Sequence, residues 1–369
     1  MKIVVDDKIP YIRETICQLA DEVVFLSGAA ITAADVKEAD VLVVRTRTHC
    51  NQQLLEGSKV QLVVTATIGY DHIDTHWLDK AGIRWTNCPG CNSGSVAQYV
   101  ECSLLLLEQQ KKLPLSQSTI GIVGCGHVGS KVKAVAERLG MHVLVCDPPL
   151  QKANSQKLTA NSQQLTANSQ QLTANSQQLT ANSQQLTANS YVSLDEIERR
   201  CDVITFHVPL TREGQYATWH LADDAFFRRL SRVPYIINTS RGEVIDNKAL
   251  LKALEEGRVR DAVIDVWENE PHPDAALLEK VFIGTPHIAG YSADGKVNAD
   301  NMVVDAICQQ FGLPHPEPIV PPTLPSDIHF TGSPLDLYNP MDDSRKLKAE
   351  PSFFEQLRNN YPLRREKKD

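Results

Sequence analysis

The stretch that decides the fold is Thr119-Ile120-Gly121-Ile122-Val123-Gly124-Cys125-Gly126-His127-Val128-Gly129. Its apolar start predicts a strand over Thr119–Val123, and its glycines then follow the spacing G-x-G-x-x-G. A helical pattern over Val128–Leu139 comes next, and a second strand over His142–Cys146 leads to Asp147. A strand, a glycine-rich turn, a helix and a second strand in this order are the context that a dinucleotide-binding βαβ unit requires.

The three glycines and the acidic residue each have a predicted role in this unit. Gly124 permits the tight turn, Gly126 lets the backbone approach a pyrophosphate at the helix N-terminus, and Gly129 allows close helix packing. Asp147 lies 18 residues after Gly129 and can accept hydrogen bonds from the adenosine ribose hydroxyls. Its charge would repel a 2′-phosphate, so the sequence favours NAD over NADP. The alternative, a glycine-rich turn without a ligand, does not explain the flanking strands and helix.

The segments on either side continue the alternation of strands and helices. Before the glycine-rich turn, the first residues of the chain form a strand pattern, and helical patterns lie between later strands. Two long helices are predicted over Ser93–Gln110 and Ser292–Phe311. Alternation of this kind predicts parallel sheets with helices on both faces, and so an α/β fold. The other predicted strands are Val41–Val44, Gln61–Ala66, Ile83–Trp85, Val203–His207, Tyr235–Asn238, Ala262–Val266 and Val281–Gly284.

An internal tandem repeat interrupts the second α/β series. The unit Ala-Asn-Ser-Gln-Gln-Leu-Thr recurs with a period of seven between Ala153 and Ser190. A period of seven suggests a coiled coil, but one Leu and one Ala per unit cannot build an apolar seam. Asn, Ser and Thr also disfavour helix interiors. We therefore expect residues 153–190 to be a disordered insertion, with a repeat-based binding surface as the alternative.

Length and charge limit the class of protein. The chain has 369 residues, enough for two or three domains, and 37 Lys and Arg against 45 Asp and Glu give a net charge of −8. This balance argues against a nucleic-acid partner, which needs a basic face. The longest purely apolar run, Leu104–Leu107, falls far short of the about 20 residues of a spanning helix, and the first residues do not resemble a signal peptide. We therefore expect a cytoplasmic protein with no membrane partner.

The cysteines predict neither disulfides nor a metal centre. There are 9 of them, an odd number in a chain without a secretory signal, which indicates reduced thiols. Cys88 and Cys91 form a C-x-x-C motif, but no second pair follows at the spacing of zinc ligands. A turn is the expected structure there, and no metal is expected.

Three predicted strands end in polar segments that could form a catalytic site. These segments are residues 237–242, 265–271 and 285–291, and they carry Arg241, Glu270 and His287. Ligands of doubly wound sheets bind at the carboxyl ends of strands, so the three side chains could share one cleft. An imidazole can take the proton of an alcohol that is being oxidised, and a carboxylate beside it would orient it. A guanidinium could hold a substrate carboxylate with two hydrogen bonds.

Together these motifs resemble the D-isomer-specific 2-hydroxyacid dehydrogenases over about residues 1–310, apart from the repeat. The resemblance is strongest to members that oxidise 4-phospho-D-erythronate with NAD to a 2-oxo acid in pyridoxal phosphate biosynthesis. The strings that carry it are Thr65-Ala66-Thr67-Ile68-Gly69-Tyr70-Asp71-His72-Ile73-Asp74, Pro89-Gly90-Cys91-Asn92, Cys146-Asp147-Pro148-Pro149, Phe206-His207-Val208-Pro209-Leu210 and His287-Ile288-Ala289-Gly290-Tyr291.

The resemblance implies roles for individual residues. His287 would be the acid or base, Glu270 its partner and Arg241 the group that binds the substrate carboxylate. Further substrate contacts would come from Thr46, Thr67 and Tyr291, with Arg45 and Arg47 as phosphate ligands by charge. Contacts along NAD would come from Asp147, Thr239, Arg241, Asp265 and Gly290, together with Gly124, Gly126 and Gly129.

The resemblance also implies a domain organisation and a homodimer. A flavodoxin-like α/β substrate domain would span residues 1–100 and be completed by 288–311, and a Rossmann-type NAD domain would span 101–287. Residues 312–369 would form a C-terminal dimerisation region, which ends earlier than is usual in the family. Three alternatives remain: a dehydrogenase of another D-2-hydroxy acid such as phosphoglycerate or glycerate, a non-catalytic NAD-sensing protein, and an inactive truncated paralogue.

Overall fold

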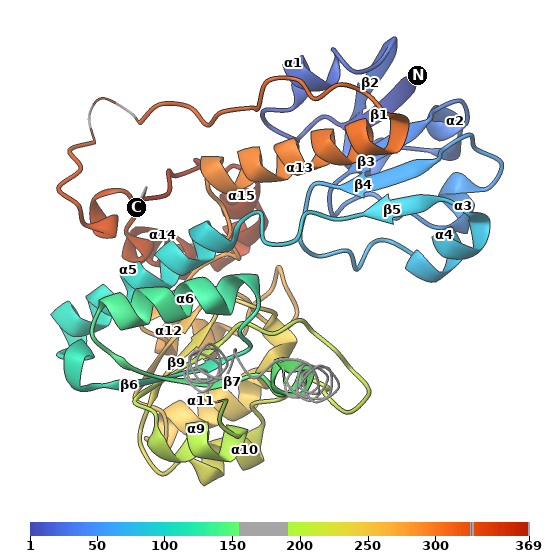
Figure 1. The fold of residues 1–369 in the computed structure, drawn as a ribbon. Helices are drawn as coiled ribbons and strands as arrows, with labels where there is room; N and C mark the ends of the chain where they lie inside the picture. Colours follow the sequence, from blue (N-terminus) through green and yellow to red (C-terminus); the bar gives the residue numbers. More distant parts are fainter. Residues whose placement is uncertain (155–190, 325, 327, 368–369) are drawn as a thin grey trace, which may run out of the picture. The chain divides into compact units, whose positions relative to one another are not determined.

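The computed structural model describes residues 1–154, 191–324, 326 and 328–367 (Figure 1). The chain forms two compact units, each assembled from segments that are distant in sequence. Unit 1 comprises Met1–Gln98, Gly290–Tyr338 and Pro362–Asp369, and unit 2 comprises Tyr99–Ala289 and Asn339–Tyr361. The predicted insertion over residues 153–190 lies outside the described residues except for its first two positions.

Unit 1 is built on a five-stranded sheet in the order β2-β1-β3-β4-β5. All four strand pairings are parallel, and the order is that of flavodoxin-like folds. Short helices and one long helix cover the sheet (Figure 1). Alternate strand residues enter two separate apolar clusters, one containing Ile3, Val5 and Val64, the other Val4 and Val63, so both faces are buried. The strands are β1 (Lys2–Asp6), β2 (Glu22–Leu26), β3 (Val41–Val44), β4 (Leu62–Thr65) and β5 (Arg84–Thr86).

The helices of unit 1 begin at identifiable capping residues. Thr32 and Asp35 form a capping box at the start of α2, and Asp74 caps α4 through the Trp77 N–H. Gly82 ends α4 in the left-handed conformation, with a φ of 72°. The helices are α1 (Arg13–Ile16), α2 (Ala33–Val36), α3 (Gln52–Leu55), α4 (Thr75–Ala81) and α13 (Ala293–Phe311), with short 3-10 turns at η1 (Gly28–Ala30) and η4 (Pro334–Asp336).

Unit 2 is built on a six-stranded parallel sheet in the order β11-β10-β9-β8-β6-β7. The chain enters at β6, moves outward to β7 and returns to β8, so the order reverses between β6 and β8. A reversal of this kind opens a crevice at the carboxyl ends of the two strands. The strands are β6 (Thr119–Val123), β7 (His142–Cys146), β8 (Val203–Phe206), β9 (Tyr235–Asn238), β10 (Asp261–Ile264) and β11 (Ile283–Gly284).

Helices flank this sheet and share its apolar core. Ile204, Phe206, Ile236 and Ile264 belong to one buried cluster with residues of the surrounding helices. Helix α5 (Ser93–Lys111) crosses from unit 1 into unit 2 in sequence. The others are α6 (His127–Arg138), α9 (Leu194–Arg200), α10 (Asp224–Arg229), α11 (Asn247–Glu255), α12 (Ala275–Lys280), α14 (Pro340–Ala349) and α15 (Phe354–Asn359), with 3-10 turns η2 (Leu115–Gln117), η3 (Gly242–Val244) and η5 (Pro351–Phe353).

The C-terminal segment is divided between the two units. Helices α14 and α15 belong to unit 2, where Leu347 and Phe354 are buried in its core cluster. The residues after Pro362 return to unit 1, where the Arg364 carbonyl accepts a hydrogen bond from the Ala293 N–H. The segment predicted for dimerisation is therefore folded onto the chain's own units over its described helices.

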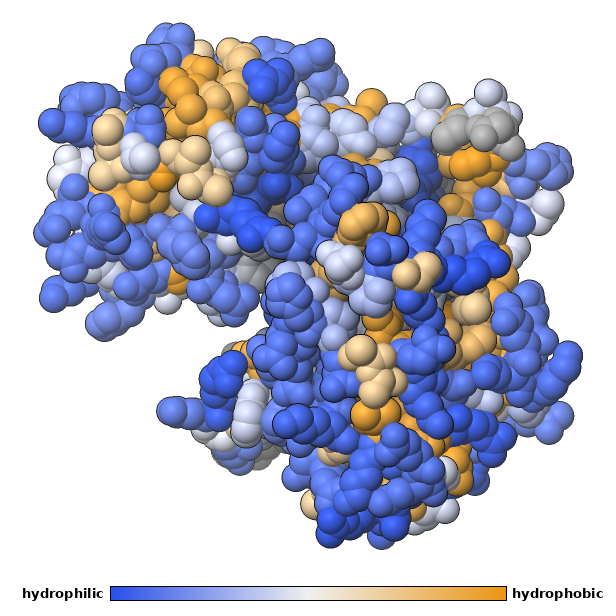
Figure 2. Space-filling model, turned by 180° about the vertical axis from the view of Figure 1, so that it is seen from behind, coloured by the Kyte–Doolittle hydropathy of each residue, from blue (hydrophilic) through white to orange (hydrophobic). Residues whose placement is uncertain are grey.

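The face drawn in Figure 2 is mostly hydrophilic, with hydrophobic side chains in small groups. The strongly exposed large hydrophobic residues include four from the chain after α13, led by Val320 at 76% exposure. No helix in the parts of the chain that are described is long and apolar enough to span a membrane. The other three exposed large hydrophobic residues that follow α13 are Leu324, Phe330 and Phe353.

Candidate functional site

The glycine-rich turn lies between β6 and α6, at the carboxyl edge of the six-stranded sheet. Gly124 has a φ of 89°, and a Cβ atom there would lie 2.7 Å from the His207 carbonyl oxygen. A Cβ on Gly129 would lie 2.0 Å from the Gly124 carbonyl oxygen, so helix and turn are in backbone contact. A Cβ on Gly126 would meet nothing within 4 Å. The turn is therefore closed at Gly124 and Gly129 and open at Gly126, where an anion can approach the start of α6.

Asp147 follows β7 and holds the glycine-rich turn from the side. Its Oδ2 accepts a hydrogen bond from the Cys125 N–H at 2.8 Å, and its Oδ1 accepts one from the Leu150 N–H at 3.0 Å. Each carboxylate oxygen has two lone pairs, so these bonds leave acceptor capacity for a hydroxyl group. The Asp147 carboxylate and the glycine-rich turn therefore form one local structure.

The three polar segments predicted from the sequence lie at one edge of this sheet. The parallel register places Ile264 at the end of β10 level with Asn238 of β9 and with Gly284 of β11. A Cβ on Gly242 would lie 2.1 Å from the Trp267 carbonyl oxygen, so the segments after β9 and β10 touch through their backbones. The sheet thus brings the chain around Arg241, Glu270 and His287 together.

Glu270 and His287 form a hydrogen-bonded pair at this edge. The His287 Nδ1 lies 2.8 Å from Glu270 Oε2 and 3.1 Å from Oε1, and the two side chains are 27% and 20% exposed. The Trp267 N–H donates to Glu270 Oε1 at 3.0 Å, and Arg358 Nη1 lies 3.5 Å from Oε2. Burial opposes ionisation of Glu270, but these donors and charges hold its pKa below the usual range. An ionised Glu270 accepts a hydrogen bond from the Nδ1–H of His287, which leaves Nε2 of the imidazole for chemistry.

The backbone at the pair is unusual. His287 has a φ of 58° and Asn269, next to Glu270, has a φ of 60°. Residues with a side chain rarely adopt this left-handed region, and conformations of this kind concentrate at functional sites because the surrounding structure must enforce them. The fold therefore maintains an unfavourable backbone conformation at both halves of the pair.

Asp265 fixes the loop that carries His287. Its carboxylate is 1% exposed and accepts hydrogen bonds from the Thr285 hydroxyl at 2.6 Å and from the N–H groups of Ile288 at 2.8 Å and Ala289 at 2.9 Å. The His287 N–H donates to the Asp265 carbonyl oxygen at 2.8 Å. These bonds place the Asp265 carboxylate beneath the loop, where it orients the backbone on both sides of His287.

The segment after β9 carries Thr239 and Arg241. The Arg241 guanidinium donates to the Ser240 carbonyl at 2.8 Å, and the Asn238 side-chain amide donates to the Arg241 carbonyl at 2.9 Å. The Thr239 hydroxyl lies 3.4 Å from His207 Nδ1. Both residues are therefore held at the carboxyl edge of the sheet by short-range bonds.

The predicted substrate residues before residue 100 gather at one edge of the other sheet, in unit 1. Arg45, Thr46 and Arg47 follow β3 directly and Thr67 follows β4, and the register pairs Val44 with Thr65 at the ends of these strands. Thr46 and Arg47 are exposed, whereas the Thr67 hydroxyl donates to the Gly69 carbonyl oxygen at 2.8 Å. The carboxyl edge of this sheet therefore offers cationic and hydroxyl groups together.

Arg45 has a buried acidic partner on β1. Its Nε lies 3.4 Å from Oδ2 of Asp6, which is 1% exposed. The ion pair holds the start of the polar segment against β1. Arg47, two positions further along, is exposed.

Gly290 and Tyr291 lie in unit 1, just before α13. A Cβ on Gly290 would lie 2.2 Å from the Asn92 side-chain nitrogen, so the chain passes Asn92 in close contact. The Lys296 ammonium lies 4.4 Å from the centre of the Tyr291 ring. Lys296 is therefore a cation beside Tyr291, which was predicted to contact the substrate. The sequence analysis did not identify Lys296, although its position one turn into α13 after Tyr291 could have indicated it.

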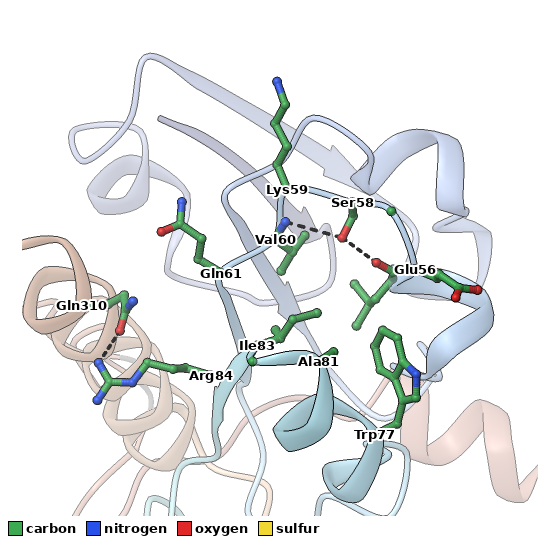
Figure 3. A pocket seen from close by; sticks show the side chains of 13 residues that line it. Glu56, Ser58, Lys59, Val60, Gln61, Trp77, Ala81, Ile83, Arg84 and Gln310 are labelled. Carbon is green, nitrogen blue, oxygen red and sulfur yellow. Dashed lines mark hydrogen bonds between the residues drawn. The ribbon is translucent and has the colours of Figure 1, made fainter.

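A cavity of about 500 Å³ on unit 1 contains none of these residues (Figure 3). Its lining includes Trp77, Lys59 and Arg84, and Arg84 Nη1 donates to Gln310 Oε1 at 2.6 Å. Gln61 and Ile83, which also line it, precede β4 and β5, so the cavity lies at the amino ends of the strands. Because ligands of doubly wound sheets bind at the carboxyl ends, this cavity is not the site predicted from the sequence.

Residues 106–186 and 170–289 match the family model of the D-isomer specific 2-hydroxyacid dehydrogenase, NAD binding domain. The fold supports the same class: a D-lactate dehydrogenase from Aquifex aeolicus, complexed with NAD and lactic acid, superposes with a TM-score of 0.64 at 23% identity, covering 85% of this chain and 96% of that one. An NAD⁺-bound 3-phosphoglycerate dehydrogenase from Entamoeba histolytica has a TM-score of 0.62 at 26% identity, covering 88% of this chain and 99% of the other.

Relatives that are more similar in sequence identify a family within this class. An erythronate-4-phosphate dehydrogenase from Bacteroides thetaiotaomicron is 49% identical over 372 residues, covering 100% of this chain and 98% of the relative. A second from Escherichia coli O157:H7 is 38% identical over 384 residues, covering 99% and 92%. The chain belongs to the erythronate-4-phosphate dehydrogenase family. The predictions of an α/β Rossmann-type fold, of an NAD-dependent oxidoreductase and of NAD as cofactor are thereby confirmed.

Proposed function

We propose that this chain oxidises the 2-hydroxyl group of 4-phospho-D-erythronate with NAD, giving 2-oxo-3-hydroxy-4-phosphobutanoate and NADH in pyridoxal 5′-phosphate biosynthesis. The observation that carries the proposal is the Glu270–His287 pair at the carboxyl edge of an NAD-type sheet, in which His287 Nδ1 lies 2.8 Å from Glu270 Oε2. The names and identities of the full-length relatives give the substrate.

The residues of unit 2 fit a dinucleotide. The open position at Gly126 leaves room for a pyrophosphate at the start of α6, and Asp147 offers acceptors for ribose hydroxyls. Thr239 and Arg241 follow β9 at the same edge. When bound, NAD supplies the nicotinamide ring that accepts a hydride from the substrate carbon.

His287 is the general base of the oxidation in this proposal. Its ring accepts the hydroxyl proton at Nε2 as the C–H bond breaks, because Nδ1 is bonded to Glu270. The ionised Glu270 stabilises the imidazolium that results and fixes the ring orientation. Arg241 binds the substrate carboxylate with its guanidinium fork. In the reverse direction, the His287 imidazolium returns the proton to the carbonyl oxygen.

Unit 1 binds the remainder of the substrate in the same proposal. Thr46, Thr67 and Tyr291 would contact its hydroxyl and carboxylate groups, and Arg45 and Arg47 its phosphate. Residues 1–100 with 288–311 act as the substrate domain, and residues 101–287 as the NAD domain. The cytoplasmic location stays a prediction of the sequence.

We also propose a homodimer formed through residues 312–369. Support comes from the hydrophobic side chains of Val320, Leu324, Phe330 and Phe353, which are exposed on this segment. Light scattering after size-exclusion chromatography would give a mass near twice the 40.9 kDa of the chain. A monomer at micromolar concentration would exclude the dimer.

The activity is tested by NADH formation with 4-phospho-D-erythronate against 3-phosphoglycerate and glycerate. We expect the highest kcat/KM with 4-phospho-D-erythronate, and a preference for either alternative acid would overturn the substrate assignment. The His287→Ala variant should lose turnover by at least about 100-fold while NAD affinity measured by calorimetry is retained. NAD binding without turnover of any acid by the wild-type chain would instead favour an NAD-sensing protein.

A further inference from the structure

One residue outside the predicted set reaches the Glu270–His287 pair. Arg358 lies in α15, 88 positions after Glu270 in the chain, and its Nη1 lies 3.5 Å from Glu270 Oε2. That oxygen also bonds His287 Nδ1 at 2.8 Å. Arg358 is 28% exposed, so solvent screens it only in part. The carboxylate is therefore shared between an imidazole and a guanidinium.

The segment that carries Arg358 is anchored on unit 2 independently of this contact. Phe354 of α15 is 1% exposed and Leu347 of α14 is fully buried, both within the core cluster of the sheet. The Ser344 hydroxyl accepts a hydrogen bond at 3.0 Å from the N–H of Gly284, the last residue of β11. The Lys348 ammonium donates to the Glu279 carbonyl oxygen at 3.2 Å. Helix α14 is thus bonded to the strand that leads into His287, and Phe354 anchors α15 in the same apolar core.

We propose that Arg358 is a positioning residue that orients the Glu270 carboxylate and weakens the hold of the Glu270–His287 pair on a proton. The inference rests on the proposed function, in which His287 must be neutral to accept a proton during oxidation. A partly buried carboxylate alone stabilises an imidazolium strongly, which would favour the reverse reaction. A cation on the same carboxylate offsets part of that stabilisation of the imidazolium.

The charged groups around the pair make this reasoning specific. Glu270 lies in the segment after β10, and its Oε2 contacts both His287 and Arg358 of α15. Its Oε1 accepts a hydrogen bond from the Trp267 N–H. Asp265 is the second carboxylate near His287, but its oxygens accept from Thr285, Ile288 and Ala289. Arg358 is thus the cation that the described contacts place on Glu270, and its removal changes the charge of the pair by one unit.

The test is a comparison of R358M with wild type, in which titration and turnover are measured separately. Histidine side-chain NMR of the full chain, with the His287 signal assigned from the spectrum of H287N, follows protonation without any substrate. We expect the His287 titration midpoint to rise by about one pH unit in R358M. The acid limb of kcat/KM for oxidation should move to higher pH by the same amount.

The two reaction directions distinguish this role from a structural one. One pH unit below the wild-type midpoint, oxidation by R358M should fall by about tenfold, whereas reduction of the 2-oxo acid with NADH should not fall. R358K keeps the positive charge, so its His287 titration midpoint should lie close to that of wild type. R345M is the matched control, because Arg345 lies in α14 and pairs with Asp342 of the same helix.

Two outcomes would overturn the proposal. One is a His287 midpoint in R358M that equals that of wild type and R345M. The other is an equal loss in both reaction directions, which a general structural defect would produce. If R358M does not fold, the same titration of R358Q decides. Absence of turnover in wild type would contradict the proposed function, but the NMR titration would still test Arg358.

Discussion

Alanine should have different effects at Gly126 and Gly129, the two glycines that flank His127. At Gly129 it should lower the free energy of unfolding, and at Gly126 it should weaken NAD binding. Gly126→Ala adds one methyl group at the N-cap of α6, and Gly129→Ala adds one in its first turn. At Gly129 the new Cβ would lie 2.0 Å from the Gly124 carbonyl oxygen and 2.9 Å from its carbonyl carbon. At Gly126 it would meet no atom within 4 Å, and the φ of −75° lies outside the left-handed region that favours glycine.

The expected magnitudes follow from these contacts. In G129A the obstacle is backbone, so α6 or the turn must move, and such overpacking costs about 1–3 kcal/mol. Alanine in a helix recovers about 0.5–1 kcal/mol of this, which leaves a net destabilisation of about 0.5–2 kcal/mol. In G126A the free energy of unfolding should change by less than about 0.5 kcal/mol, because nothing is displaced. Its methyl group would instead occupy the space through which a pyrophosphate approaches the helix N-terminus.

Urea unfolding without cofactor and calorimetric titration with NAD separate the two effects. We expect G129A to unfold at a lower urea concentration than wild type. G126A should unfold with wild type but bind NAD at least about tenfold more weakly, equivalent to about 1.4 kcal/mol.

Wild-type NAD affinity in G126A would refute the proposed pyrophosphate position. Equal destabilisation of both variants would show that the contact at Gly129 does not set the packing of α6. These two outcomes are independent, so the experiment tests the binding argument and the packing argument separately.

Three further perturbations test the site, the insertion and the core. Glu270→Gln should lower kcat for oxidation by at least about tenfold with NAD affinity unchanged, and wild-type rates would exclude its role. Deleting residues 155–182, four whole repeat units, should shift the melting temperature by less than about 3 °C. Burial raises the pKa of Asp300 to about 7, so its contribution to stability is lost as the pH rises through 7. Asp300→Asn should therefore gain melting temperature over wild type between pH 5 and 8, and a constant difference would contradict this.

Much of the fold could be predicted because strands and helices here are specified locally. The strands Thr119–Val123, His142–Cys146 and Tyr235–Asn238 have the predicted bounds, since each is an apolar run that begins after a turn. The strand Glu22–Leu26 was missed, although it is also a short apolar run. The predicted helix over Ser292–Phe311 agrees with Ala293–Phe311 in the structure, where Ser292 is the N-cap.

The contacts of the site were less predictable than its residues. Glu270 and His287 could be paired in advance because both follow strands of one parallel sheet, whose carboxyl ends meet. Arg358 lies beyond the sheet in a short helix, and its contact with Glu270 depends on the burial of Phe354 and Leu347. Nothing in the local sequence of α15 encodes that packing, so only the three-dimensional structure reveals the contact. The bonds of the Asp265 carboxylate to the loop of His287 likewise could not be read from the sequence, and its expected place along NAD stays a prediction.

The place of the tandem repeat explains how such an insertion is compatible with the site. Asn154 and Tyr191 are the described residues on either side of the repeat, and the Asn154 side-chain amide donates to the Tyr191 hydroxyl at 3.3 Å. The Val192 N–H then donates to the Val145 carbonyl oxygen at 2.8 Å, on β7, the edge strand of the sheet. Because the two ends of the inserted segment are joined at an edge strand, its length does not alter the register of β6, β8, β9, β10 or β11. The geometry of Glu270, His287 and Arg358 depends on those inner strands and on the helices packed against them, and is therefore independent of the number of repeat units.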